Sequence, residues 1–286
     1  MLTIILFTVG ALAVFFLAVM AIDCNRFTIR EYSCNAENLE KDTKVVLLSD
    51  MHNKSFGENN QRLVRAIDKV SPDIILIAGD MYTASKGQGA KEALQLMEML
   101  AKRYPVYYGN GNHEQKTALY PKDYGNVYQT FAKELKRLGV RHLVNEKASL
   151  AGQKIAVYGL ELGREYYRKF QKKEMDKGYL EKILGRPDPS EYSILIAHNP
   201  DYFEDYAAWG ADLVVSGHVH GGLMRLPFLG GVISPAMRLF PKYDGGFFKT
   251  GRSCLILSRG LGTHTLPIRI FNPGELVVIR LRAALR

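Results

Sequence analysis

Five apolar, strand-length runs of this chain each end in side chains that commonly bind metal ions. In chain order the runs end in Asp50 and His52, in Asp80, in Asn112 and His113, in His198, and in His218 and His220. Five of the seven histidines of the chain lie at these positions. A single histidine is more often an ordinary core or surface residue, but this joint occurrence, beside small residues, predicts a shared site.

The residue types indicate two metal ions and not one. Two aspartates, one asparagine and four of the histidines supply seven oxygen or nitrogen donors, which is more than one tetrahedral ion takes. Such a set suits two divalent first-row metals (manganese, iron or zinc) with one bridging carboxylate. A pair of ions about 3.5–4 Å apart can bind a phosphate, lower the pKa of a water molecule and stabilise the entering and leaving oxygens.

The elements that must position these side chains alternate between strands and helices. Apolar runs predict strands over residues 44–50, 73–80, 141–145, 153–162, 192–199, 211–218, 254–260 and 275–281, and helical spacing predicts helices over residues 60–70, 91–104 and 127–139. Strands that are apolar on both faces and separated by helices are typical of an α/β layered fold. The loops beyond the carboxyl ends of such strands form a ligand crevice, so groups far apart in sequence can converge.

The ordered motifs DMH, GD, GNHE, AH and GHVH resemble those of the calcineurin-like metallophosphoesterase superfamily, over about residues 44–282. The resemblance implies a two-sheet α/β sandwich flanked by helices, and a metal-dependent phosphoric ester hydrolase. It assigns Asp50, His52 and His220 to one metal, Asn112, His198 and His218 to the other, and Asp80 to both. His113 matches the family's catalytic histidine, which protonates the leaving oxygen or steadies the transition state.

Two further features qualify the resemblance. Many members carry an aspartate three residues after the GD aspartate, where this chain has Thr83, which puts a contact behind the ligands in doubt. The C-terminal part is similar to the membrane-associated bacterial branch, the YkuE- and YaeI-type phosphoesterases, some of which hydrolyse lipid-linked phosphates. That similarity makes Arg225, Arg259, His264 and Arg269 candidate phosphate or head-group contacts, with simple surface charge as the alternative.

Residues 2–22 form an uncharged apolar run. At 1.5 Å per residue a helix of this length covers about 30 Å, the thickness of a hydrocarbon core, so we expect a transmembrane anchor. The alternative is a cleaved signal peptide, for which Val19 and Ala21 offer small residues, although the run is longer than usual and no basic residue precedes it. Basic residues follow the run, which favours a single-pass protein with a cytoplasmic body.

We therefore expect an anchor over residues 2–22, a linker over 23–43 and a catalytic domain over 44–286. Residues 164–182 interrupt the alternation with many basic and aromatic side chains. This segment is either a lid over the site or a solvated surface helix. The three cysteines form no CxxC pair, so neither a thiolate zinc site nor a disulfide framework is indicated, and free thiols are expected unless Cys24 and Cys34 face an oxidising compartment.

These features together predict a membrane-anchored, dinuclear metal-dependent phosphoesterase acting on a phosphate ester or pyrophosphate bond, of a small-molecule, nucleotide-linked or lipid-linked substrate. The net charge of +9 is compatible with anionic partners. One alternative is a catalytically silent metal-binding scaffold at the membrane, although no ligand is missing. Another is a nuclease of the same fold, but outside residues 164–182 no basic and aromatic stripe is visible, so nucleic acid is not an expected partner.

Overall fold

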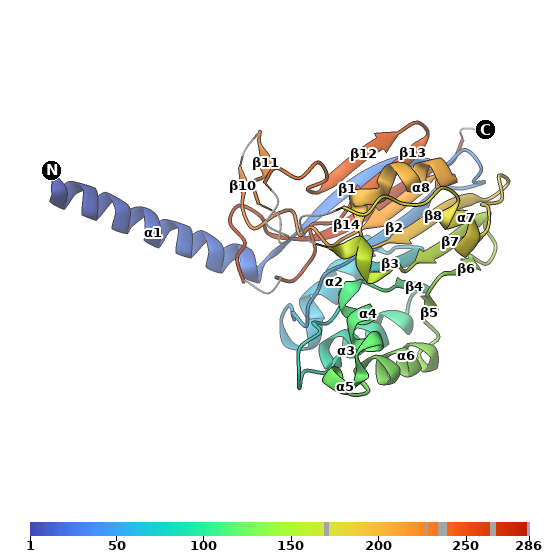
Figure 1. The fold of residues 1–286 in the computed structure, drawn as a ribbon, viewed down its shortest axis with the longest axis horizontal. Coiled ribbons are helices and arrows are strands. Elements are labelled where there is room, and N and C mark those ends of the chain that lie inside the picture. Colours follow the sequence, from blue (N-terminus) through green and yellow to red (C-terminus); the bar gives the residue numbers. More distant parts are fainter. Residues whose placement is uncertain (169–171, 227, 234–238, 264–266, 285–286) are drawn as a thin grey trace.

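Two six-stranded sheets and a set of outer helices make up the body of the protein, and one long helix projects from it (Figure 1). The computed structural model describes residues 1–168, 172–226, 228–233, 239–263 and 267–284. The helices are α1 (Leu2–Asn25), α2 (Gln61–Val70), α3 (Lys91–Ala101), α4 (Asn112–Leu119), α5 (Pro121–Tyr124), α6 (Val127–Arg137), α7 (Tyr179–Leu184) and α8 (Phe203–Trp209), with short 3-10 turns η1 (Glu58–Asn60), η2 (Arg164–Tyr167) and η3 (Pro200–Tyr202).

The first sheet has the strand order β1-β14-β2-β3-β4-β5. Its strands are β1 (Phe27–Asn35), β14 (Gly274–Arg282), β2 (Thr43–Leu48), β3 (Ile74–Ala78), β4 (Val106–Gly109) and β5 (Arg141–Leu143). Strands β2, β3, β4 and β5 run parallel, while β14 is antiparallel to β2 and parallel to β1. The carboxyl ends of β2, β3 and β4 therefore lie at one edge of this sheet.

The second sheet has the order β12-β13-β9-β8-β7-β6. Its strands are β12 (Gly246–Thr250), β13 (Ser253–Leu257), β9 (Leu213–Ser216), β8 (Tyr192–Ala197), β7 (Ile155–Leu160) and β6 (Glu146–Ser149), and a separate hairpin pairs β10 (Arg225–Leu226) with β11 (Gly230–Gly231). Strands β13, β9, β8 and β7 are parallel, and β12 and β6 close the edges in antiparallel pairing.

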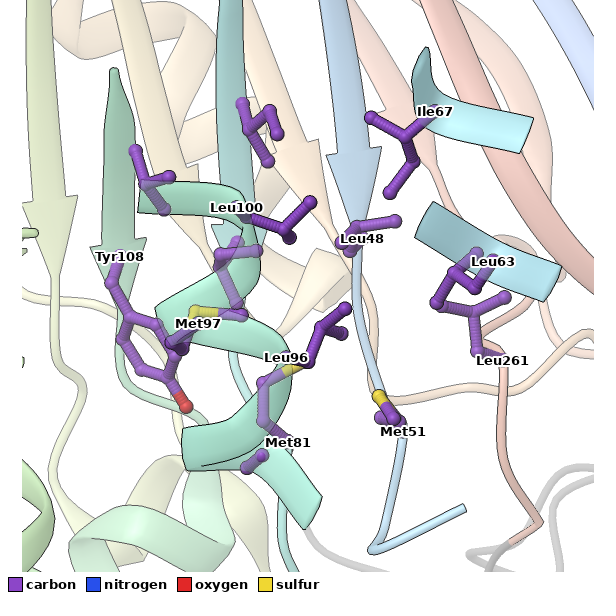
Figure 2. Close-up of a cluster of buried hydrophobic side chains, with 14 of the residues drawn as sticks. Leu48, Met51, Leu63, Ile67, Met81, Leu96, Met97, Leu100, Tyr108 and Leu261 are labelled. Carbon is purple, nitrogen blue, oxygen red and sulfur yellow. The ribbon is translucent and has the colours of Figure 1, made fainter. Parts of the chain in front are cut away.

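The sheets pack face to face, and helices cover their outer faces. In β2, Val45 and Leu47 point into the apolar layer between the sheets, whereas Val46 and Leu48 point to the helix side, as the two-residue period of a strand requires. Helix α3 buries residues at helical spacing against the first sheet, and Figure 2 shows Leu100 beside Leu48 and Met97 beside Tyr108. Helices α7 and α8 cover the second sheet. The expected two-sheet α/β sandwich is confirmed.

The segment expected to be a linker, residues 23–43, instead contains the edge strand β1. This strand pairs with β14 along its whole length, from Phe27 opposite Gly274 to Asn35 opposite Arg282. Most of its side chains are exposed, and Cys34 is its one fully buried residue. Edge strands keep charged and polar side chains in water, so the apolar signal that marks the central strands is missing here.

Helix α1 is the one helix among the described residues that is long and apolar enough to cross a membrane. Its most apolar 18-residue window has no residue buried inside the protein. Figure 1 shows the helix leaving the body at its C-terminal end.

Candidate metal centre

The polar side chains that follow the parallel strands meet at one edge of the sandwich. Asp50 and His52 follow β2, Asp80 follows β3, Asn112 and His113 begin α4 after β4, His198 follows β8, and His218 and His220 follow β9. Carboxyl ends of parallel strands share an edge, and here the edges of both sheets face each other. The backbone N–H of His218 donates to Oδ1 of Asp50 at 2.9 Å, which joins the two sheets directly.

Three groups of side chains place metal-binding atoms within 4.8 Å of one another. The groups are Asp50 with His52 and His220, His52 with Asp80 and His113, and Asp80 with His198 and His218. The first and third groups match the division between two ions that the family resemblance implies. The ligand roles themselves stay a prediction.

Asp80 has the central position in this arrangement. Its Oδ2 lies 3.1 Å from Nε2 of His198 and 3.9 Å from Nε2 of both His52 and His113. The Asp80 side chain is almost entirely buried. A carboxylate that faces histidines of both groups is placed to bridge two ions.

Asn112 adds an oxygen that fits a metal ligand. Its Oδ1 is buried and has no hydrogen-bond partner among the residues that the structure describes. Leaving a buried carbonyl oxygen unpaired costs free energy, and a divalent cation beside it would satisfy this atom. The donor set and this oxygen therefore fit the divalent metals that the family uses.

The backbone at the site is held in a sparsely populated conformation. The residues with positive φ are Asp50 (50°), His52 (47°), Asp80 (54°), His218 (74°) and His220 (54°). Non-glycine residues rarely adopt this region, and such strain clusters at functional sites. Glycines allow the close approach: a Cβ on Gly111 would overlap the Asp80 carboxylate, and one on Gly217 would overlap that of Asp50.

Hydrogen bonds to the far ring nitrogen orient several of the histidines. Nδ1 of His198 lies 2.5 Å from the carbonyl oxygen of Ala78, and Nδ1 of His113 accepts the backbone N–H of Ala84 at 2.8 Å. Such contacts fix the tautomer and aim Nε2 at the site.

Thr83 supplies the same kind of contact to His52, with Oγ1 3.2 Å from Nδ1. Many members of the family have an aspartate where this chain has Thr83, which put a contact behind the ligands in doubt. In this chain the Thr83 hydroxyl makes a contact of that kind, to the ring of His52.

Glu114 is a structural part of the site to which the motif analysis gave no role. Its carboxylate accepts backbone N–H groups of Asp80 and Gly111 at 2.9 and 3.0 Å, and the hydroxyl of Tyr108 at 2.7 Å. It therefore ties the loop after β3 to the loop after β4. Its place directly after Asn-His in the GNHE motif is the sequence signal that could have identified it.

Burial and neighbouring charges shift the pKa values of several side chains at the site. Burial raises the pKa of Asp50 to about 6 and that of Glu114 to about 7. For His198, burial lowers the pKa, but the Asp80 carboxylate outweighs this and raises it to about 10. Burial lowers the pKa of His113. The buried carboxyl groups of Asp50, Asp80 and Glu114 together form a region that favours cations.

The first residues of the basic and aromatic segment, residues 164–182, contact the site. Nη1 of Arg164 donates to the carbonyl oxygen of Asn112 at 3.2 Å. The ring of Tyr167 lies 5.2 Å from that of His218. Residues 169–171 lie outside the described residues, and α7 occupies the end of the segment. The contacts of Arg164 and Tyr167 support the lid interpretation over the surface helix.

The three candidate substrate contacts that the structure describes occupy different surroundings. Arg269 is 2% exposed, and its guanidinium donates to backbone carbonyls, including those of Arg259 at 2.9 Å and Asn272 at 3.1 Å. These bonds brace a loop, so the expectation of a substrate contact at Arg269 is corrected. Half-buried Arg225 forms an ion pair with Asp244 at 3.0 Å.

Arg259 stays a candidate substrate contact, since its Nε lies 3.9 Å from Glu275 and no closer ion pair of Arg259 occurs among the residues that the structure describes. His264 lies outside the described residues.

Several known proteins are similar to this chain in sequence. Residues 43–222 match the calcineurin-like phosphoesterase family. The chain is 28% identical over 261 residues to an uncharacterized metallophosphoesterase of Campylobacter jejuni, covering 89% of this chain and 63% of the relative. It is 28% identical to the uncharacterized metallophosphoesterase YkuE of Bacillus subtilis, covering 84% and 79%.

A third relative, from Danio rerio, is named a transmembrane protein with metallophosphoesterase domain, at 26% identity over 84% of this chain and 53% of the relative. The chain thus spans less than two thirds of the length of some relatives it matches. The family match covers most of the sandwich and every strand end that carries a candidate ligand. The chain therefore belongs to the calcineurin-like phosphoesterase family.

Proposed function

We propose that the protein is a membrane-anchored, dinuclear metal-dependent phosphoesterase that hydrolyses a phosphate ester or pyrophosphate bond. Asp50, His52 and His220 would hold one ion, Asn112, His198 and His218 the other, and Asp80 both. The observation that carries this proposal is the central position of Asp80, which shares one three-donor group with His52 and His113 and another with His198 and His218. When bound, divalent ions neutralise the phosphate charge and activate water as a nucleophile.

His113 acts on the leaving group in this proposal. Because its Nδ1 accepts the N–H of Ala84, the ring proton belongs on Nε2, the atom that faces Asp80 across 3.9 Å. An Nε2–H group directed into the site can donate a hydrogen bond or a proton to the oxygen on which charge develops. Arg164 and Tyr167, at the start of the lid segment, would lie over the site beside Asn112 and His218, which they contact.

The anchoring part of the proposal rests on α1. The helix is exposed and apolar, and the Danio rerio relative is named a transmembrane protein. A body held at a membrane suits a lipid-linked phosphate substrate, and a cytoplasmic body follows from the basic residues after the helix. Resistance of the full chain to carbonate extraction, with an intact N-terminus by mass spectrometry, tests the anchor against a cleaved signal.

Hydrolysis by the detergent-solubilised full chain, with Mn²⁺ supplied, tests the enzymatic part. We expect turnover of an activated aryl phosphodiester or monoester and a fall in kcat of about a hundredfold or more in His113→Ala, because a transition-state contact is lost. Tyr120→Ala, at the exposed end of the same helix, should keep wild-type kcat. Equal turnover in His113→Ala and wild type would contradict the assigned role.

A further inference from the structure

Five exposed apolar side chains gather beside the β10–β11 hairpin, and the proposed reaction uses none of them. They are Phe228, Leu229, Leu239, Phe240 and Phe271, here called the apolar rim. Their segments are joined by backbone hydrogen bonds, from Phe240 N–H to Val232 O at 2.9 Å and from Arg225 N–H to Ile270 O at 3.0 Å. Contiguous exposed apolar groups of this kind mark an interaction surface.

The apolar rim is continuous with α1. The ring of Phe271 lies 6.4 Å from that of Phe15 and 6.3 Å from that of Phe16. The next residue, Asn272, donates its backbone N–H to Oδ2 of Asp23 at 2.9 Å. Figure 1 shows the hairpin on the same side of the body as the end of α1.

The contact with Phe16 sets the depth of Phe271 relative to a membrane. Phe16 lies six residues before Ile22, the last residue of the uncharged run. At 1.5 Å per residue this places Phe16, and the Phe271 ring against it, about 9 Å inside that end of the apolar helix. If α1 spans a bilayer, Phe271 lies below the head groups and within the hydrocarbon.

Polar and basic groups lie at the level where head groups would be. Arg26 forms an ion pair with Asp23 at 2.8 Å while its side chain stays 52% exposed. Nζ of Lys54 donates to Oδ1 of Asn25 at 2.8 Å. Basic side chains at the end of an apolar segment are placed to meet anionic lipid, which favours a bilayer over a second protein copy as the occupant of this face.

We propose that the apolar rim inserts into the bilayer leaflet nearest the body and holds the metal centre at the membrane surface. This inference rests on the proposed membrane helix. Nδ2 of Asn272 donates to the carbonyl oxygens of His220 at 2.8 Å and Gly222 at 2.7 Å, so one residue links the end of α1 to the loop that carries candidate ligands. A lipid-linked phosphate can then reach the site without leaving its leaflet.

Tryptophan quenching by brominated lipids tests this insertion in the full chain. Phe228→Trp and Phe271→Trp are reconstituted into vesicles of phosphatidylcholine and phosphatidylglycerol that carry bromine on shallow acyl positions. The reference is Tyr120→Trp, an exposed aromatic position on the helical side of the body, and the signal of the native Trp209 is subtracted. We expect quenching at both rim positions at least about twofold stronger than at the reference, since interfacial apolar groups reach 5–10 Å into the boundary.

Phe7→Trp in α1 separates the two proposals. Quenching at Phe7→Trp but not at the rim would leave the membrane helix standing and overturn the rim insertion. An absence of quenching at Phe7→Trp would overturn both. Two results together would assign the rim to a contact between copies of the chain. They are an absence of quenching at the rim positions in vesicles, and a dimer in detergent that Phe228→Ser dissociates. This outcome would also overturn the proposal.

Discussion

The two sheets contribute different chemistry to the metal centre. The first sheet supplies both central carboxylates, Asp50 and Asp80, together with Asn112. The second sheet supplies imidazoles, from His198 after β8 and from the histidines after β9. The negative charge therefore belongs to the first sheet, and the second sheet contributes imidazoles alone.

This division means that neither of the two proposed ions takes all its ligands from one sheet. Each of the two predicted ligand sets takes residues from both sheets, and Asp50 Oδ1 already accepts a hydrogen bond from the backbone of His218. Metal binding should consequently stabilise the packing of one sheet on the other, since a ligand that binds only the folded state raises its stability.

The largest expected effect follows from removing the shared carboxylate. Asp80→Ala should lose affinity for both ions and lower kcat/KM by about a thousandfold or more, because each ion loses a ligand and its charge partner. Metal analysis and aryl phosphate hydrolysis of the same preparation measure this. A variant that keeps both ions would break the proposed bridging role.

Chelation should show that the ions join the sheets. Removing one ion present at a hundred times its Kd costs about 2.7 kcal/mol of stability, which corresponds to a fall in Tm of about 5–10 °C for a domain of this size. Thermal unfolding with and without EDTA measures the shift. Asp80→Ala serves as the control, and its Tm should respond far less to the chelator.

The smallest expected effect concerns the hydroxyl behind His52, on the first sheet's side of the site. Thr83→Val removes the Oγ1 contact to Nδ1 of His52 with little change in shape. We expect the affinity for the first ion to fall about tenfold, as for other residues that orient metal ligands. Metal titration measures this, and unchanged affinity would show that the contact does not orient the ring.

The candidate ligands could be predicted from sequence because local features determine their place. An apolar run followed by a polar residue places a side chain at a strand end, and parallel strands then bring the ends together. Asp50, Asp80 and His198 follow this rule, and the structure places them side by side. The order of the motifs along the chain also predicted the fold class.

The surroundings of the C-terminal residues depended on contacts that no local pattern records. The motifs predict Arg269 as a phosphate or head-group contact, yet backbone carbonyls of the loop accept hydrogen bonds from its guanidinium. Asn272 joins Asp23 to His220 across most of the chain, and no local pattern marks it. Strand β1 was missed because its edge position keeps polar residues exposed.

The number of ions bound per chain tests the central claim most directly. We predict that the purified full chain binds two divalent ions, and that His218→Ala and His220→Ala each bind one, because these neighbours belong to different predicted ligand sets. Elemental analysis against protein concentration measures all three preparations. One ion in the wild-type chain, or two in either variant, would contradict a dinuclear centre shared between the sheets.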